Sequence, residues 1–138
     1  MYKRILLAID GSEHSERATD EAAKIAGLCG TSIEIVYVAD YSKAKSDVLH
    51  TQSKEDLDLA RREKLLPFEE KLESLGLSFS VKILHGEPGP AIVEYANSSE
   101  ADLVVIGSRG LNALQEMVLG SVSHKVVKRV DCPVLIVK

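Results

Sequence analysis

The sequence predicts an α/β domain built on an open, twisted sheet of five parallel strands covered by helices on both faces, a three-layer arrangement. Three observations predict it. Short apolar segments alternate with segments of helical periodicity along the whole chain. Several apolar segments are continuous, which is typical of parallel strands buried on both faces. Finally, no internal repeat or linker interrupts the 138 residues, so we expect one domain over 1–138.

Each strand is predicted from an apolar run bounded by turn residues. The first run reads KRILLAI, covers residues 3–9 and ends at an aspartate. The other four runs are residues 32–38, 78–84, 102–107 and 133–138. One helix fits between each strand and the next.

The first two helices are predicted from one-sided apolar patterns. Residues 12–30 repeat small or apolar side chains on one face, and Gly30 suits the C-cap. Ser53 and Asp56 form a capping pair for the second helix, and Pro67 should kink that helix or restart it. The expected apolar stripe of this helix is Leu57, Ala60, Phe68, Leu72 and Leu75.

Two further helices complete the pattern. Pro90 suits the first turn of the helix that covers 90–98. The last helix covers 121–130, and its expected inward face is Val122, Val126, Val127 and Val130.

This alternation predicts the strand order 3-2-1-4-5 with right-handed crossovers. The connections then reverse direction between the first and fourth strands, and ligands of such sheets bind at the carboxyl ends of those strands. Those ends carry residues 10–12 (DGS) and 107–110 (GSRG). Residues 39–53 are polar and weakly patterned, so we expect a loop near the same rim.

Composition excludes several classes of function. The chain has 17 basic and 21 acidic residues and a net charge of -4, which argues against nucleic acid as a partner but allows a small anionic ligand. No run reaches the ~18 apolar residues of a membrane span, and the N-terminal run is too short for a signal sequence. Cys29 and Cys132 lack metal-binding spacing and are expected to be buried thiols. We therefore expect a cytoplasmic protein without a membrane partner.

Residues 107–121 hold three of the nine glycines. The segment is neither a P-loop nor a dinucleotide fingerprint, because both spacings are absent. Gly107, Gly110 and Gly120 are either turn and cap glycines, or they bring backbone amides close to a phosphate chain. Ser121 is correspondingly either only the N-cap of the last helix or also a phosphate ligand, since the two roles are compatible. The intervening residues 111–119 are expected to form a spacer helix.

The combination resembles the universal stress protein family. The ATP-binding subgroup of that family carries Gly, two residues, Gly, nine residues, Gly and then Ser or Thr, which this chain matches without insertion. The resemblance extends over nearly the whole chain, through residues 5–18, 86–96, 101–110 and 120–137. It implies the Rossmann-like fold of the adenine nucleotide alpha hydrolases, and a homodimer paired through residues 133–137.

The resemblance also implies an ATP site, with Mg²⁺ bridging the phosphates. In it Asp10 faces the nucleoside, Val38 contacts adenine, and Ala8 is a further binding residue. Gly107, Arg109 and Gly110 line the ribose and phosphate path. The residues that hold the phosphates through amides and hydroxyls are Gly120, Ser121, Val122 and Ser123.

Three functions are compatible with these patterns. The first is an ATP-binding regulatory module of the stress response, without rapid hydrolysis because no general base is placed to activate water. The second is a nucleotide-independent interaction dimer whose site is vestigial. The third is a slow ATPase, or a protein that transfers phosphate onto Ser121 or Ser123.

Overall fold

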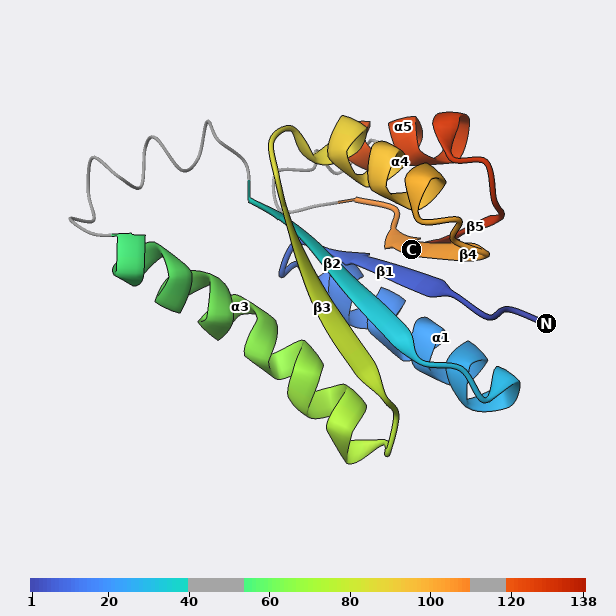
Figure 1. The fold of residues 1–138 in the computed structure, drawn as a ribbon, viewed down its shortest axis with the longest axis horizontal. Helices are drawn as coiled ribbons and strands as arrows, with labels where there is room; N and C mark the ends of the chain where they lie inside the picture. The colour runs from blue at the N-terminus through green and yellow to red at the C-terminus, as the bar shows by residue number, and fades with distance from the viewer. Residues whose placement is uncertain (40–53, 110–118) are drawn as a thin grey trace.

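The computed structural model describes residues 1–39, 54–109 and 119–138, and its centre is a five-stranded sheet (Figure 1). The strands are β1 (Ile5–Ile9), β2 (Ile33–Ala39), β3 (Phe79–His85), β4 (Leu103–Gly107) and β5 (Val134–Val137). All pair in parallel, in the order β3-β2-β1-β4-β5. The predicted fold class and strand order are therefore confirmed.

Four helices in the described part of the chain cover the two faces of this sheet. They are α1 (Glu13–Cys29), α3 (Lys54–Ser74), α4 (Pro88–Ser98) and α5 (Ser121–Arg129). Helices α1 and α3 lie on one face, and α4 and α5 lie on the other (Figure 1). Since each helix follows a strand, every helix begins at the rim where the strands end.

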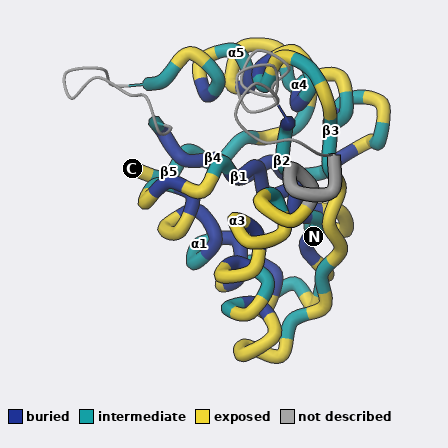
Figure 2. The backbone as a smooth tube through the Cα atoms, turned by 90° about the vertical axis from the view of Figure 1, so that its left-hand side faces the viewer, coloured by how far each residue is buried: buried dark blue, intermediate teal, exposed yellow. Residues whose placement is uncertain are grey.

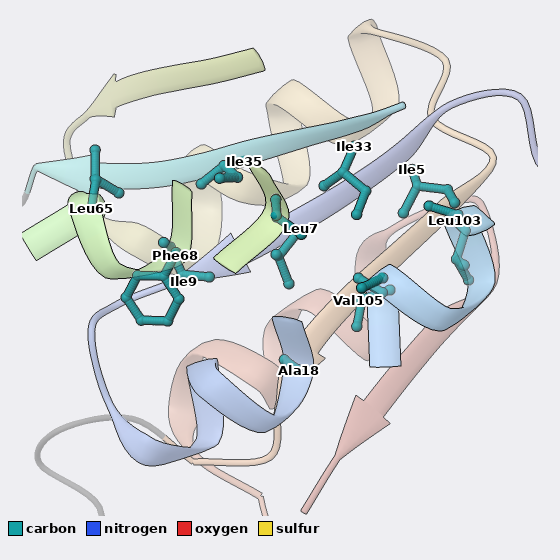
Figure 3. Close-up of a cluster of buried hydrophobic side chains, with 14 residues drawn as sticks. Ile5, Leu7, Ile9, Ala18, Ile33, Ile35, Leu65, Phe68, Leu103 and Val105 are labelled. Atoms are coloured by element: carbon teal, nitrogen blue, oxygen red, sulfur yellow. The ribbon is translucent and has the colours of Figure 1, made fainter. Parts of the chain in front are cut away.

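The core consists of two apolar layers that share the sheet. Odd-numbered strand residues pack against α1 and α3, as Figure 3 shows for Leu7 and Val105. Even-numbered residues such as Leu6 and Val104 pack against α4 and α5. Strands β1 and β4 are buried along their whole length, whereas every residue of edge strand β5 is only half-buried (Figure 2). Because successive residues of β1 and β4 face the two apolar layers in turn, the apolar runs of these strands are continuous in sequence.

Helix ends follow local chemistry. Ser12 caps α1 by accepting a hydrogen bond from the Ser15 amide. Gly30, as predicted, ends the helix in the left-handed conformation at φ 66°. The third predicted helix begins two residues earlier than expected, because Pro88 occupies its first turn and Glu87 is its N-cap. Pro90 is therefore not the residue that opens α4.

Helix α3 differs from its predicted face. It runs without interruption through Pro67, so the helix does not restart there. The buried residues are Leu65, Phe68 and Leu72, which are three and four positions apart, whereas Ala60 and Leu75 are exposed. The Ser53–Asp56 pair and the Leu57 side chain lie outside the described residues, as do most of the expected loop (39–53) and of the spacer helix.

Helix α5 also buries less than predicted. Val126 is fully buried and Val122 and Val130 pack against the same layer, but Val127 is exposed. A helix turns by ~100° per residue, so Val126 and Val127 cannot both face a flat sheet.

The cysteines are less buried than expected. Cys29 and Cys132 are free and only half-buried. Burial is the main cause that raises the pKa of the Cys132 thiol. No helix among the described residues is long and apolar enough to cross a membrane.

A polar cluster joins α4 to strands β2 and β3. Tyr95 donates a hydrogen bond of 2.5 Å to Glu34, whose carboxylate lies 3.8 Å from the guanidinium of Arg4. Burial, followed by the neighbouring Glu34, raises the pKa of the Tyr95 phenol. Lys82 lies over the Tyr95 ring, 5.8 Å from its centre. These contacts hold α4 on the sheet.

Candidate functional site

The carboxyl ends of β1, β2 and β4 meet at one rim and carry the first predicted site residues. Ala8 pairs with Val36 on one side and with Ile106 on the other, so β1 lies between β2 and β4. Ala8 belongs to the apolar layer beneath α4 and α5, and Val38 packs against that layer. The structure therefore brings Ala8 and Val38 to the sheet face that α5 covers.

Asp10 follows β1 and organises the start of α1. Its Oδ1 accepts hydrogen bonds from the Ser12 amide at 3.0 Å and the Ser15 hydroxyl at 2.8 Å. The Asp10 amide in turn donates to the Ser15 hydroxyl at 2.9 Å. This is turn chemistry of the kind that an Asp-Gly-Ser sequence favours. It fixes the half-buried Asp10 carboxylate at the rim.

Gly107 ends β4 against the first turn of α1. A Cβ at this position would lie 2.7 Å from the Cβ of His14 and 3.0 Å from its carbonyl carbon and oxygen. Such distances are too short for ordinary packing, so α1 itself requires a glycine here. The Gly107 of the motif thus has a structural reason independent of any ligand.

The residue after Gly107, Ser108, connects three elements. Its amide donates to the Val137 carbonyl of β5 at 2.8 Å. Its carbonyl accepts from the Gly120 amide at 2.7 Å and from the Ser123 hydroxyl at 2.8 Å. Its own hydroxyl lies 3.5 Å from Nδ1 of His14 in α1. Ser108 is only 2% exposed, so these bonds lie in the interior.

Helix α5 begins directly above this residue. Its N-cap is Gly120, with φ −71° and ψ 166°, and no side chain caps the helix. Ser121 is the first helical residue and is exposed, so the interpretation of Ser121 as N-cap is wrong. The first amide bonded within the helix is that of His124, 2.9 Å from the Gly120 carbonyl. The amides of residues 121–123 have no acceptor within the helix, which is the general condition of a first turn.

Among the helices whose first turns are described, α5 suits an anion best. Helix α1 places Glu13 and Glu16 in its first turn, and its Ser12 cap already accepts an amide. Helix α4 begins with Pro88 and Pro90, neither of which has an amide proton. Helix α5 has neither acidic residue nor side-chain cap in that turn. Its amides and dipole therefore favour negative charge.

Gly120 has more space for a Cβ than Gly107 has. A Cβ at Gly120 would meet its nearest atoms at 3.5–3.6 Å, which is ordinary contact. Its φ of −71° is open to any residue. The described residues therefore do not require a glycine at the N-cap of α5.

Two predicted site residues remain, Arg109 and Gly110. Arg109 is half-buried and follows Ser108 directly, and Gly110 lies outside the described residues. Sequence reasoning missed Ser108 and the contact of His14 with β4. The residues are 94 positions apart, and no local pattern links them.

The chain is similar to known proteins over its whole length. A model of the Universal stress protein family matches residues 1–138. A universal stress protein from Thermus aquaticus is 36% identical over 144 residues, which cover 100% of both chains. Hypothetical protein MJ0577, a solved structure, matches with TM-score 0.86 and 32% identity over 100% of this chain and 96% of that one.

Two similar structures contain adenine nucleotides. The universal stress protein from Archaeoglobus fulgidus in complex with dAMP has TM-score 0.74 and 26% identity, and the match covers 99% of this chain and 98% of that one. A universal stress protein in complex with cAMP has TM-score 0.73 and 27% identity over 99% and 97% of the two chains.

Proposed function

Because this chain belongs to the universal stress protein family, we propose that it binds ATP at the rim between β1 and β4 and acts as a cytoplasmic regulatory module of the stress response. The nucleotide complexes of two similar proteins support an adenine nucleotide as the ligand. The free, half-buried thiols suit a reducing compartment.

The observation that carries the proposal is the first turn of α5. It is free of acidic residues, prolines and side-chain caps, and it begins at a glycine that the described residues do not require. A glycine without an internal reason at a helix N-terminus is expected where a phosphate approaches the backbone closely. In our proposal the amides of Ser121, Val122 and Ser123 bind the phosphates.

In the proposal the remaining predicted residues contact the base, the nucleoside and the path of the phosphates. Val38 and Ala8 supply apolar contact to the base, and Asp10 supplies a carboxylate to the nucleoside. Arg109 and Gly110 line the phosphate path. The described residues contain no group of three His, Cys, Asp or Glu side chains that could hold a metal ion. In our proposal Mg²⁺ bridges the phosphates and keeps several of its waters.

We propose a switch and not an enzyme, with at most slow hydrolysis. Two ionisable side chains that follow β1, Asp10 and His14, are engaged by contacts within the fold. Asp10 accepts two hydrogen bonds through Oδ1, and Nδ1 of His14 lies 3.2 Å from the guanidinium of Arg17. A general base must reach the proton it removes, and these contacts oppose that role.

A homodimer through residues 133–137 is part of the proposal. Strand β5 is an edge of the sheet, with β4 on one side only, and its apolar residues are half-buried. An apolar strand with one unpaired edge favours pairing with another strand. Static light scattering at micromolar concentration tests this, and a monomer would contradict it.

Nucleotide retention tests the main proposal. We expect protein purified without added nucleotide to release ATP or ADP on denaturation. Calorimetry should then show affinity in the order ATP, AMP, adenosine, because the phosphates use the α5 amides. Retained dimerisation with no detectable affinity for any of the three would favour the vestigial site instead. Transfer of γ-labelled phosphate onto the protein would favour the enzyme.

A further inference from the structure

Ser123 holds a buried hydroxyl in the first turn of α5, and its single proton is already used. The residue is 2% exposed. Its Oγ donates to the Ser108 carbonyl at 2.8 Å, with the Gly120 carbonyl at 3.2 Å as the alternative acceptor. A serine hydroxyl carries one proton, and both neighbouring carbonyl groups are acceptors for it.

Direct donation to a phosphate would therefore have a cost. The proton would have to leave the Ser108 carbonyl, and breaking a buried hydrogen bond is unfavourable. What remains on Oγ is acceptor capacity, which ionised phosphate oxygens, themselves acceptors, cannot use. Ser121, one residue into the helix and exposed, has no such restriction.

The same bond fixes where α5 begins. The Ser108 carbonyl receives the Gly120 amide and the Ser123 hydroxyl together, so two bonds join the first turn of α5 to the end of β4. The Ser108 amide is bonded to the Val137 carbonyl of β5. The turn is thus attached to the carboxyl ends of β4 and β5 before any ligand arrives, and preorganised donors bind anions better than mobile ones.

We propose that the Ser123 side chain has a positioning role: it strengthens nucleotide binding by attaching the first turn of α5 to the Ser108 carbonyl and not by contact of its hydroxyl with the phosphates. The inference rests on the proposed ATP site and specifies how that site is held. It makes the amides of this turn, with the Ser121 hydroxyl, the groups that contact phosphate.

The test compares Ser123→Ala with Ser121→Ala in two measurements. The first is amide exchange at Gly120 and His124 in nucleotide-free protein, because these amides are bonded at 2.7 and 2.9 Å. We expect Ser123→Ala to accelerate both by about five-fold, the effect of one lost hydrogen bond, and Ser121→Ala to change neither. The second is the ratio of ATP affinity to adenosine affinity, which both variants should lower.

Thr31→Val is the matched control. Thr31 lies at the opposite end of the sheet, where its hydroxyl donates to the Tyr2 carbonyl at 2.7 Å. It should lose stability but keep the affinity ratio, so general destabilisation is separated from positioning.

Each outcome is decisive. A lowered ratio in Ser123→Ala with unchanged exchange would assign a direct phosphate contact and overturn the positioning role. Unchanged exchange together with an unchanged ratio would also overturn it. If the wild type binds no nucleotide, the proposed function fails, and accelerated exchange would then support only the attachment of α5.

Discussion

Substitution by alanine should have different effects at the two motif glycines whose surroundings are described: it should lower stability at Gly107 and lower ATP affinity at Gly120. Gly107→Ala places a methyl 2.7 Å from the Cβ of His14 and 3.0 Å from its backbone, so helix α1 must shift. Overpacking of this kind costs about 1–3 kcal/mol. In a chain of this size that corresponds to a fall in Tm of roughly 4–12 °C.

Gly120→Ala should leave stability almost unchanged. Its Cβ finds ordinary contacts at 3.5–3.6 Å, and φ is −71°. Alanine is a poorer N-cap than glycine by about 0.5 kcal/mol, which reduced freedom of the unfolded chain offsets by a similar amount.

The effect of Gly120→Ala should instead appear in binding. A methyl at this position would hinder a phosphate that approaches the α5 amides. Loss of one hydrogen bond to a charged group costs about 1.5–3 kcal/mol. That is a decrease in ATP affinity of roughly 10- to 100-fold, with adenosine affinity unchanged.

Urea unfolding and isothermal calorimetry on both variants complete this experiment. Wild-type ATP affinity in Gly120→Ala would remove the phosphates from this turn. Wild-type stability in Gly107→Ala would show that the inferred contact with His14 does not constrain the fold.

Three further predictions concern the rest of the fold. Asp102→Ala should lower the free energy of unfolding by about 1–3 kcal/mol, because Oδ2 of Asp102 accepts the amides of Lys3 at 2.9 Å and Arg4 at 2.8 Å; urea unfolding measures this, and no change would contradict it. The Cys132 thiol should react more slowly with iodoacetamide in the folded protein than in urea, because burial raises its pKa and the thiolate is the nucleophile; equal rates would refute this. The raised pKa of Tyr95 should stabilise the fold below pH 10.0, the ordinary pKa of tyrosine, and this stability should be lost as the pH rises through the pKa of the folded state. Tyr95→Phe should reduce this loss of unfolding free energy at alkaline pH. An unaltered dependence of the unfolding free energy on pH would count against the prediction.

The strands were predictable because their signal is local. A run such as residues 102–107 must be apolar on consecutive positions once helices cover both faces, and β4 occupies Leu103–Gly107. The C-cap of α1 was predictable for the same reason, since Gly30 acts on the neighbouring backbone. Errors arose where neighbouring positions compete for one face, as for Val126 and Val127.

The site was only partly predictable. The spacing from Gly107 to Gly120 and Ser121 predicted a phosphate-binding segment, which stays a prediction; the structure adds that α5 begins at Ser121. Spacing did not reveal that Gly107 accommodates His14, or that the Ser123 hydroxyl is bonded to Ser108. Such roles depend on contacts between residues distant in the chain.

By itself the sequence determined the α/β class, the strand order and the segment on which phosphate binding is proposed, because hydrophobic periodicity, caps and motif spacing act over a few residues. The tertiary structure alone decided that packing requires a glycine at Gly107 and that the described residues do not require one at Gly120, because that depends on what lies within 4 Å of a missing Cβ. It also decided that Ser123 faces the interior while Ser121 faces solvent. Two serines separated by one helical position are alike in sequence, and only the sheet beneath α5 distinguishes them.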